Sequence, residues 1–155
     1  MKPVHLSKRF FGSLRPGGPS LEDERWAESH LLPGEVELWR RMSGADRRHA
    51  VGVARQVAHR DRPVIAAALL HDVGKVVAGL GTFARVGATL AGMVHRRWGG
   101  RVGEYLRHGE LGARLLADAG SDPLTAAWAR EHHLPPARWT VDREVAAELH
   151  AADDD

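Results

Sequence analysis

The sequence predicts an all-α domain, and three observations support this prediction. Apolar residues recur at helical spacing through most of the 155 residues, whereas the apolar–polar alternation of a half-buried strand is almost absent. N-capping residues, glycines and prolines divide the chain into segments that suit short helices. Hydrophobic residues make up 43% of the chain, which is enough to bury one core. We therefore expect a single compact domain of about seven or eight helices.

Capping and breaking residues set the expected helix boundaries in order along the chain. The predicted N-caps are Ser20, Asp46, Asp61 and Asp122. The predicted stops and loops are Pro33-Gly34, Ser43-Gly44, Gly99-Gly100, Gly120 and Pro135-Pro136. The helices are then expected at residues 21–32, 35–42, 47–60, 64–72, 76–94, 102–119, 124–134 and 142–155.

The first residues differ in character from the rest of the chain. Residues 1–19 are basic and interrupted by glycine and proline, so we expect a flexible N-terminal tail before a helical domain at 20–155. The tail lacks the apolar core of a signal peptide. Segment 76–94 approaches membrane-spanning length, but Arg85 at its centre would cost about 2.5–3.5 kcal/mol in a bilayer. We expect a buried helix there and no transmembrane segment, with membrane-surface contact as the weaker alternative.

Charge and cysteine content narrow the function classes. The net charge is +2 and the pI is about 9.5, which mildly favours an anionic partner without giving firm evidence for nucleic acid. The chain has no cysteine, which excludes disulfides and thiolate-bound zinc and is compatible with the cytoplasmic location that we expect. Any metal ion must therefore be held by nitrogen and oxygen ligands.

The segment "LLHDVGKVV" places three polar groups at the end of an apolar helix. Seven apolar positions precede His71 and Asp72, so the last turn should carry both side chains into the interior, with Lys75 one turn later. Buried polar groups need partners, and neighbours on a helix project about 100° apart, which makes direct pairing awkward. A metal ion shared with ligands from other helices would satisfy both groups.

The other histidines are the natural source of such ligands. Five of the ten lie beside charged or polar neighbours or in the tail and are interpreted as surface residues: His5, His30, His59, His95 and His150. Four others lie on expected helices that carry apolar residues: His49, His108, His132 and His133. Separate helices can deliver such ligands to one interior point. Taken singly, each of the four also fits a core or surface histidine without metal.

The order of these residues resembles the HD-domain superfamily of metal-dependent phosphohydrolases. The resemblance rests on "RRHAVGVA", "HDVGK", "YLRHGELGARLL", "REHHLPP" and the aspartate at position 153 in "LHAADDD". It is most similar to the HD-GYP branch, which cleaves cyclic dinucleotides. Two features depart from that branch: "HHLPPARWT" replaces the Gly-Tyr-Pro segment, and Ala45 stands where some three-metal members carry a glutamate.

The resemblance implies an HD-type fold with a dinuclear metal site between its helices. One divalent ion would be held by His49, His71, Asp72 and Asp153. Asp72 would bridge to a second ion held by His108 and by His132 or His133. This donor mix suits Fe, Mn or Zn and is also compatible with Mg, Co or Ni. Two such ions about 3.5–4 Å apart activate a bridging water for attack on a phosphoryl group.

The resemblance also implies roles for nearby cations. Lys75 would face the phosphate and offset charge that develops during the reaction, with Asp72 and Lys75 as the catalytic residues. Arg48 and Arg130, together with Arg47, flank the ligands and are weaker phosphate-binding candidates, for which a solvated surface is the alternative interpretation.

Three function classes follow from this interpretation. The preferred class is a metal-dependent phosphohydrolase or phosphodiesterase acting on a nucleotide or another small phosphate ester. The alternatives are an HD-type di-iron oxygenase and a regulatory or binding module without turnover. The substrate, the metal and the oligomeric state are not indicated by the sequence.

Overall fold

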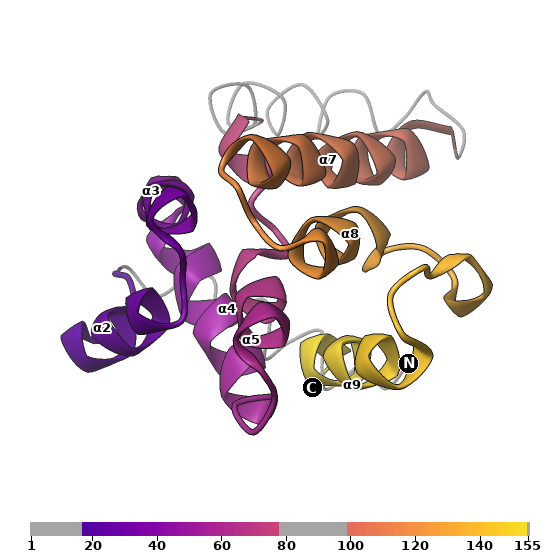
Figure 1. Cartoon of the computed structure of the whole chain (residues 1–155). Coiled ribbons are helices and arrows are strands. Elements are labelled where there is room, and N and C mark those ends of the chain that lie inside the picture. The colour runs from indigo at the N-terminus through magenta and orange to yellow at the C-terminus, as the bar shows by residue number, and fades with distance from the viewer. Residues whose placement is uncertain (1–16, 78–98, 155) are drawn as a thin grey trace.

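Helices make up the ordered elements of the protein, as predicted. The computed structural model describes residues 17–77 and 99–154, and in these ranges it contains seven α-helices, one 3₁₀ turn and no strand (Figure 1). The all-α prediction is confirmed. The elements are α2 (Leu21–Ser29), α3 (Pro33–Arg41), α4 (Gly44–Gln56), α5 (Arg62–Leu70), α7 (Gly99–Asp118), α8 (Pro123–Glu131), η1 (Pro136–Arg138) and α9 (Arg143–Asp154).

Serine hydroxyls begin two helices in the same way. Ser20 Oγ accepts the backbone N–H of Asp23 at 3.0 Å at the start of α2, as predicted. Ser43 Oγ accepts the N–H of Asp46 at 3.1 Å at the start of α4. The prediction that Asp46 caps this helix was therefore wrong, because Ser43, expected to end the previous helix, is a strong N-cap three residues earlier. Each aspartate also accepts a hydrogen bond from its serine.

Two other predicted breaks are the first residues of helices. Pro33 begins α3, because proline at the first helical position loses no intrahelical hydrogen bond. The buried carboxylate of Glu35 accepts the N–H of Leu32 at 2.7 Å and completes that helix start. Gly99 and Gly100 form the start of α7 rather than the expected loop.

The predicted end of α7 and start of α8 fit the structure better. Gly120 follows α7 with a φ of +76°, a left-handed conformation that glycine adopts without strain. Asp122 Oδ1 then accepts the N–H of Leu124 at 3.0 Å and caps α8. The Oγ1 of the buried Thr125 donates to the carbonyl of Pro63 at 3.1 Å, which joins the first turns of α8 and α5.

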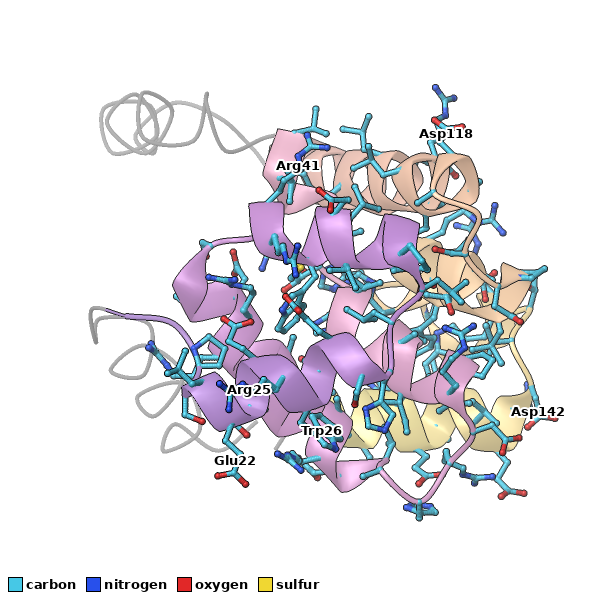
Figure 2. All side chains as sticks on the ribbon, turned by 60° about the vertical axis from the view of Figure 1, so that its left-hand side comes forward. Glu22, Arg25, Trp26, Arg41, Asp118 and Asp142 are labelled. Carbon is cyan, nitrogen blue, oxygen red and sulfur yellow. The ribbon has the colours of Figure 1, made fainter. Side chains whose placement is uncertain are left out.

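Helix α5 forms the centre of the core. All residues from Val64 to Leu70 are buried, and α4, α8, α9 and α3 contact this helix. Figure 1 shows α8 between α7 and α9, with α7 lying along α8. Trp39 and Trp128 are buried in this core. Helix α2 lies at the surface, where its Glu22 and Arg25 side chains are exposed (Figure 2).

Glycines allow the "HDVGK" turn to lie directly on α7. A Cβ atom at Gly74 would lie 2.0 Å from the carbonyl oxygen of His108, so no larger residue fits there. A Cβ at Gly109 would lie 2.9 Å from the carbonyl oxygen of Arg130. Backbone contact through Gly74 and Gly109 therefore places the turn, α7 and the end of α8 against one another.

Two predictions concern segments outside the described residues. Most of the basic tail and most of the expected helix at 76–94 fall at 1–16 and 78–98, respectively. Among the helices that the structure describes, none has the length and hydrophobicity needed to cross a membrane.

Candidate metal centre

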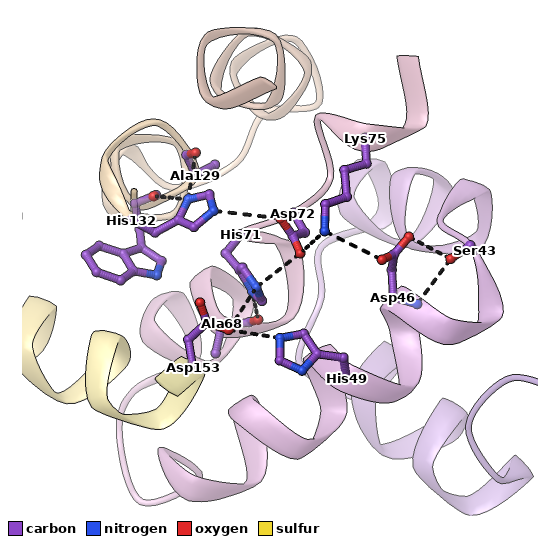
Figure 3. Close-up of polar contacts among 11 residues, drawn as sticks. Ser43, Asp46, His49, Ala68, His71, Asp72, Lys75, Ala129, His132 and Asp153 are labelled. Carbon is purple, nitrogen blue, oxygen red and sulfur yellow. Dashed lines mark hydrogen bonds and ion pairs between the residues drawn. The ribbon is translucent and has the colours of Figure 1, made fainter. Parts of the chain in front are cut away.

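Four helices bring histidine and aspartate side chains to one place. His49 comes from α4, His71 and Asp72 follow the end of α5, His132 follows α8, and Asp153 lies in the last turn of α9 (Figure 3). The ends of α5 and α8 therefore contribute the buried part of the centre, as expected for polar groups that terminate apolar helices.

The ring of His71 is fixed by its own helix. Its Nδ1–H donates to the carbonyl of Ala68 at 2.8 Å, which leaves the lone pair of Nε2 directed into the centre. Nε2 lies 3.5 Å from Asp72 Oδ2 and 3.7 Å from Asp153 Oδ1. Burial disfavours the charged ring and lowers the pKa of His71, so the imidazole is the neutral form that binds metal.

His132 has the same arrangement at the end of α8. Its Nδ1–H donates to the carbonyl of Ala129 at 3.0 Å, and its Nε2 faces Asp72 Oδ1 at 3.7 Å, beyond hydrogen-bond distance. This Nε2 is buried and has no hydrogen-bond partner among the described residues. A buried acceptor without a partner is costly, and a cation at this position would satisfy it. The donor set thus fits a metal ion.

Asp72 is the shared anion of the centre. Burial alone would raise the pKa of its carboxyl, but the contacts with His132, His71 and Lys75 outweigh burial and hold the pKa well below its usual range. The carboxylate is therefore ionised, and its two oxygens face different imidazoles. This is the geometry of a group that can contact two cations at once.

A contact between α4 and α9 brings Asp153 to the His49 and His71 side of the centre. His49 Nε2 lies 2.9 Å from Asp153 Oδ1, and both side chains are half-buried. Gln56 Nε2 donates to the carbonyl of Ala152 at 3.1 Å and holds the end of α9 on α4. Asp153, which the family resemblance implies as a ligand, therefore lies beside His49 and His71.

Two overlapping groups of potential ligands result. In each group, the nitrogen and oxygen atoms lie within 4.8 Å of one another, and Asp72 belongs to both. The first group is His49, His71 and Asp72; the second is Asp72, His132 and His133. His133 is the most exposed member, and loss of solvent together with its proximity to His132 lowers its pKa to about 4.

His108 belongs to neither group. Its side chain is half-buried, and its backbone carbonyl lies against Gly74 in the turn that follows Asp72. The backbone of α7 therefore lies beside the centre, whereas the imidazole of His108 is outside both ligand groups. Three of the histidines interpreted as surface residues also lie outside both groups: His30, His59 and His150.

The cations that the sequence offered for phosphate binding are all engaged. Lys75 Nζ lies 2.6 Å from Asp72 Oδ2 and 3.7 Å from Asp46 Oδ1. Loss of solvent disfavours this ammonium group, but the charges of Asp72 and Asp46 raise the pKa of Lys75. Arg48 donates to the carbonyl of Gly17 at 2.5 Å. Two further pairs are Arg47 with Glu24 at 3.1 Å and Arg130 with Glu131 at 3.6 Å.

Two acidic residues beside the centre were not predicted to matter there. Asp46 was interpreted only as a helix cap, and its Ser-x-x-Asp spacing gave no sign of the contact with Lys75. Glu131 is buried and accepts hydrogen bonds from Thr140 N at 2.6 Å, Thr140 Oγ1 at 2.5 Å and Val141 N at 3.2 Å. It ties the end of α8 to the segment that leads into α9. Nothing in its sequence context distinguishes it from a surface glutamate.

Comparison with known proteins agrees with this geometry. The family model of the HD domain matches residues 47–153, a range that begins two residues before His49 and ends at Asp153. Comparisons with curated proteins and with solved structures gave no match. The matched range covers more than half of the chain and includes every residue of both ligand groups. The chain therefore belongs to the HD domain family.

Proposed function

We propose that this protein is a metal-dependent phosphohydrolase that acts on a nucleotide or another small phosphate ester. The observation that carries the proposal is the ionised Asp72 carboxylate shared by two groups of histidines. HD domains are commonly metal-dependent phosphohydrolases, which supports the same reaction class. A dinuclear centre is the arrangement that a shared carboxylate favours.

The ligand assignment follows from the contacts. His49, His71 and Asp72 would hold one divalent ion, with Asp153 completing the set through its proximity to both histidines. Asp72 with His132 and His133 would hold the second, and His108 is the further ligand that the family resemblance implies. Fe, Mn or Zn suits these donors, and Mg, Co or Ni is compatible. Divalent ions bound there supply a water of lowered pKa and polarise the phosphoryl oxygens.

The residues of the chain prepare the site for that chemistry. The carbonyls of Ala68 and Ala129 fix the tautomers of His71 and His132, so neither ring has to reorient to expose Nε2. Lys75 holds its ammonium group at the exposed edge of Asp72, where it would meet a substrate phosphate and offset its charge. In this proposal Asp72 is the ligand shared by both ions, and Lys75 is the cation that binds the substrate phosphate.

Metal analysis of protein purified without chelator tests the centre directly. We expect two divalent ions per chain in the wild type and close to none in His71→Ala and Asp72→Ala. His59→Ala is the matched control, because His59 is exposed and pairs with Glu148 on the surface. Equal metal content in all four proteins would contradict the assignment.

Turnover tests the reaction class. The metal-loaded protein should release phosphate, or a linearised nucleotide, from some member of a panel of nucleotides and phosphate esters. Oxygen uptake that depends on substrate and iron would instead identify the oxygenase alternative. Metal binding without either activity would favour a regulatory module.

A further inference from the structure

Lys75 is held between two carboxylates rather than one. Figure 3 shows its side chain reaching from the "HDVGK" turn toward Asp72 on one side and toward Asp46 on the other. Nζ lies 2.6 Å from Asp72 Oδ2 and 3.7 Å from Asp46 Oδ1. Asp46 is half-buried and belongs to the first turn of α4, three residues before His49. Its carboxylate therefore lies at the edge of the centre without belonging to either ligand group.

The orientation of Asp46 is fixed by its other contact. Ser43 Oγ donates to Asp46 Oδ2 at 2.6 Å, and the hydroxyl in turn accepts the N–H of Asp46. With Oδ2 held by the serine, Oδ1 is the oxygen that faces Lys75. Asp46 is thus a fixed negative charge next to the lysine rather than a mobile surface carboxylate.

This charge changes what the lysine offers to an anion. One ammonium group next to two carboxylates attracts an incoming anion less than an ammonium group next to one. Two of the arginines near the ligands in sequence have carboxylate partners of their own, since Arg47 pairs with Glu24 and Arg130 pairs with Glu131. A phosphate group with two negative charges is repelled by Asp46 about twice as strongly as a group with one.

We propose that Asp46 is a specificity-determining residue, whose carboxylate makes the Lys75 side of the centre discriminate against doubly charged phosphate groups in favour of singly charged ones. The inference rests on the proposed function and specifies its substrate class. The favoured substrates carry a phosphodiester, or another singly ionised phosphoryl group, at the centre. Terminal phosphate monoesters are disfavoured.

Binding of two matched phosphonates tests the role of Asp46 without turnover. The probes are phenylphosphonate, at a pH where it is a dianion, and its monomethyl ester, which is a monoanion. Each is titrated by calorimetry into the full chain loaded with Mn²⁺. We expect Asp46→Asn to raise the affinity for the dianion relative to the monoanion by about twofold or more, as expected for one extra charge about 8 Å away in water. Asp46→Ser leaves the Ser43 cap of α4 in place, because that cap accepts the backbone N–H of residue 46, and it should shift the ratio in the same direction.

Asp23→Asn is the matched control. Asp23 has the same contacts with Ser20 at the start of α2, but it pairs with Arg55 instead of Lys75. Its substitution should leave the ratio of the two affinities unchanged. An unchanged ratio in both Asp46 variants, or an equal shift in Asp23→Asn, would overturn the role of Asp46 and leave the proposed function intact. Absence of binding of both probes to the wild type would overturn both.

Discussion

The Nε2 atom of His132 faces Oδ1 of Asp72 across 3.7 Å (Figure 3). The imidazole is buried and has no other partner for this nitrogen among the described residues. A carboxylate and an imidazole at this separation leave room for an ion that contacts both. The stability of the protein should therefore depend on metal.

Metal binding should raise the melting temperature. A ligand that binds only the folded state at about 100 times its Kd stabilises that state by about 2.7 kcal/mol. We expect Mn²⁺ or Zn²⁺ to raise the melting temperature of the wild type measured by calorimetry. Asp72→Ala should show little increase, whereas the surface variant His59→Ala should behave as the wild type. An increase of the same size in Asp72→Ala would argue against the centre.

Gly74→Ala should be strongly destabilising. The added methyl group would collide with the carbonyl of His108, and relief requires the turn and α7 to separate. We expect a loss of about 3 kcal/mol or more in the free energy of unfolding, measured with urea. Gly52→Ala is the control, because nothing lies within 4 Å of its added Cβ and the position is inside α4. It should stabilise the protein by about 0.5–1 kcal/mol, and a tolerated Gly74→Ala would show that the close approach is not required.

Glu131 should make stability depend on acid pH. Burial favours the protonated carboxyl, but the hydrogen bonds from Thr140 and Val141 outweigh it and lower the pKa of Glu131 in the folded state. Its contribution is present above the unfolded pKa of about 4.3 and is lost as the pH falls through the lower folded value. Glu131→Gln removes this proton linkage and should cost about 1–3 kcal/mol at neutral pH.

The difference in unfolding free energy between wild type and Glu131→Gln should therefore narrow as the pH falls from about 7 to about 3. Urea titrations across this range measure it. Glu144→Gln is a useful comparison, because Glu144 is exposed and pairs with Arg60 on the surface. A gap between wild type and Glu131→Gln that stays constant with pH would contradict the lowered pKa.

Metal affinity should persist below the ordinary titration range of histidine. Protons compete with metal ions for imidazole nitrogen, and a free histidine titrates near about 6.5. The pKa of His133 is lowered to about 4 and that of His71 is also lowered, so competition at these two rings begins at a lower pH. We expect only a gradual fall in Zn²⁺ affinity between about pH 7 and about pH 5.5. Titration of the His71 and His133 rings in metal-free protein, followed by NMR, measures the shifts directly, and an ordinary histidine value for either ring would contradict them.

The helical fold and much of the centre follow from local patterns. The apolar run before His71 predicts a buried helix with polar groups at its end, and the structure confirms this. Local patterns do not decide which residue caps α4, since Ser43 and Asp46 are both good N-cap residues and only the backbone geometry selects the serine. Asp153 illustrates the opposite case, because its neighbours in sequence are acidic and only the packing of α9 on α4 brings it to His49.

Long-range contacts are what local patterns leave open. Asp46 and Lys75 are far apart in sequence and meet because α4 packs on α5. The three hydrogen bonds of Glu131 likewise depend on the path of the chain from α8 to α9. His108 shows that helix placement does not fix a side chain, since its backbone adjoins the turn while its imidazole joins neither group.

The anchoring of His71 and His132 to the carbonyls of Ala68 and Ala129 has a mechanical consequence. Each ring moves as a rigid extension of its own helix, so the distance between the two nitrogens reports how α5 and α8 are placed relative to each other. The bond from Thr125 to Pro63 links those helices at their opposite ends. A substitution at Thr125, which belongs to neither ligand group, should therefore alter the distance between these two imidazoles.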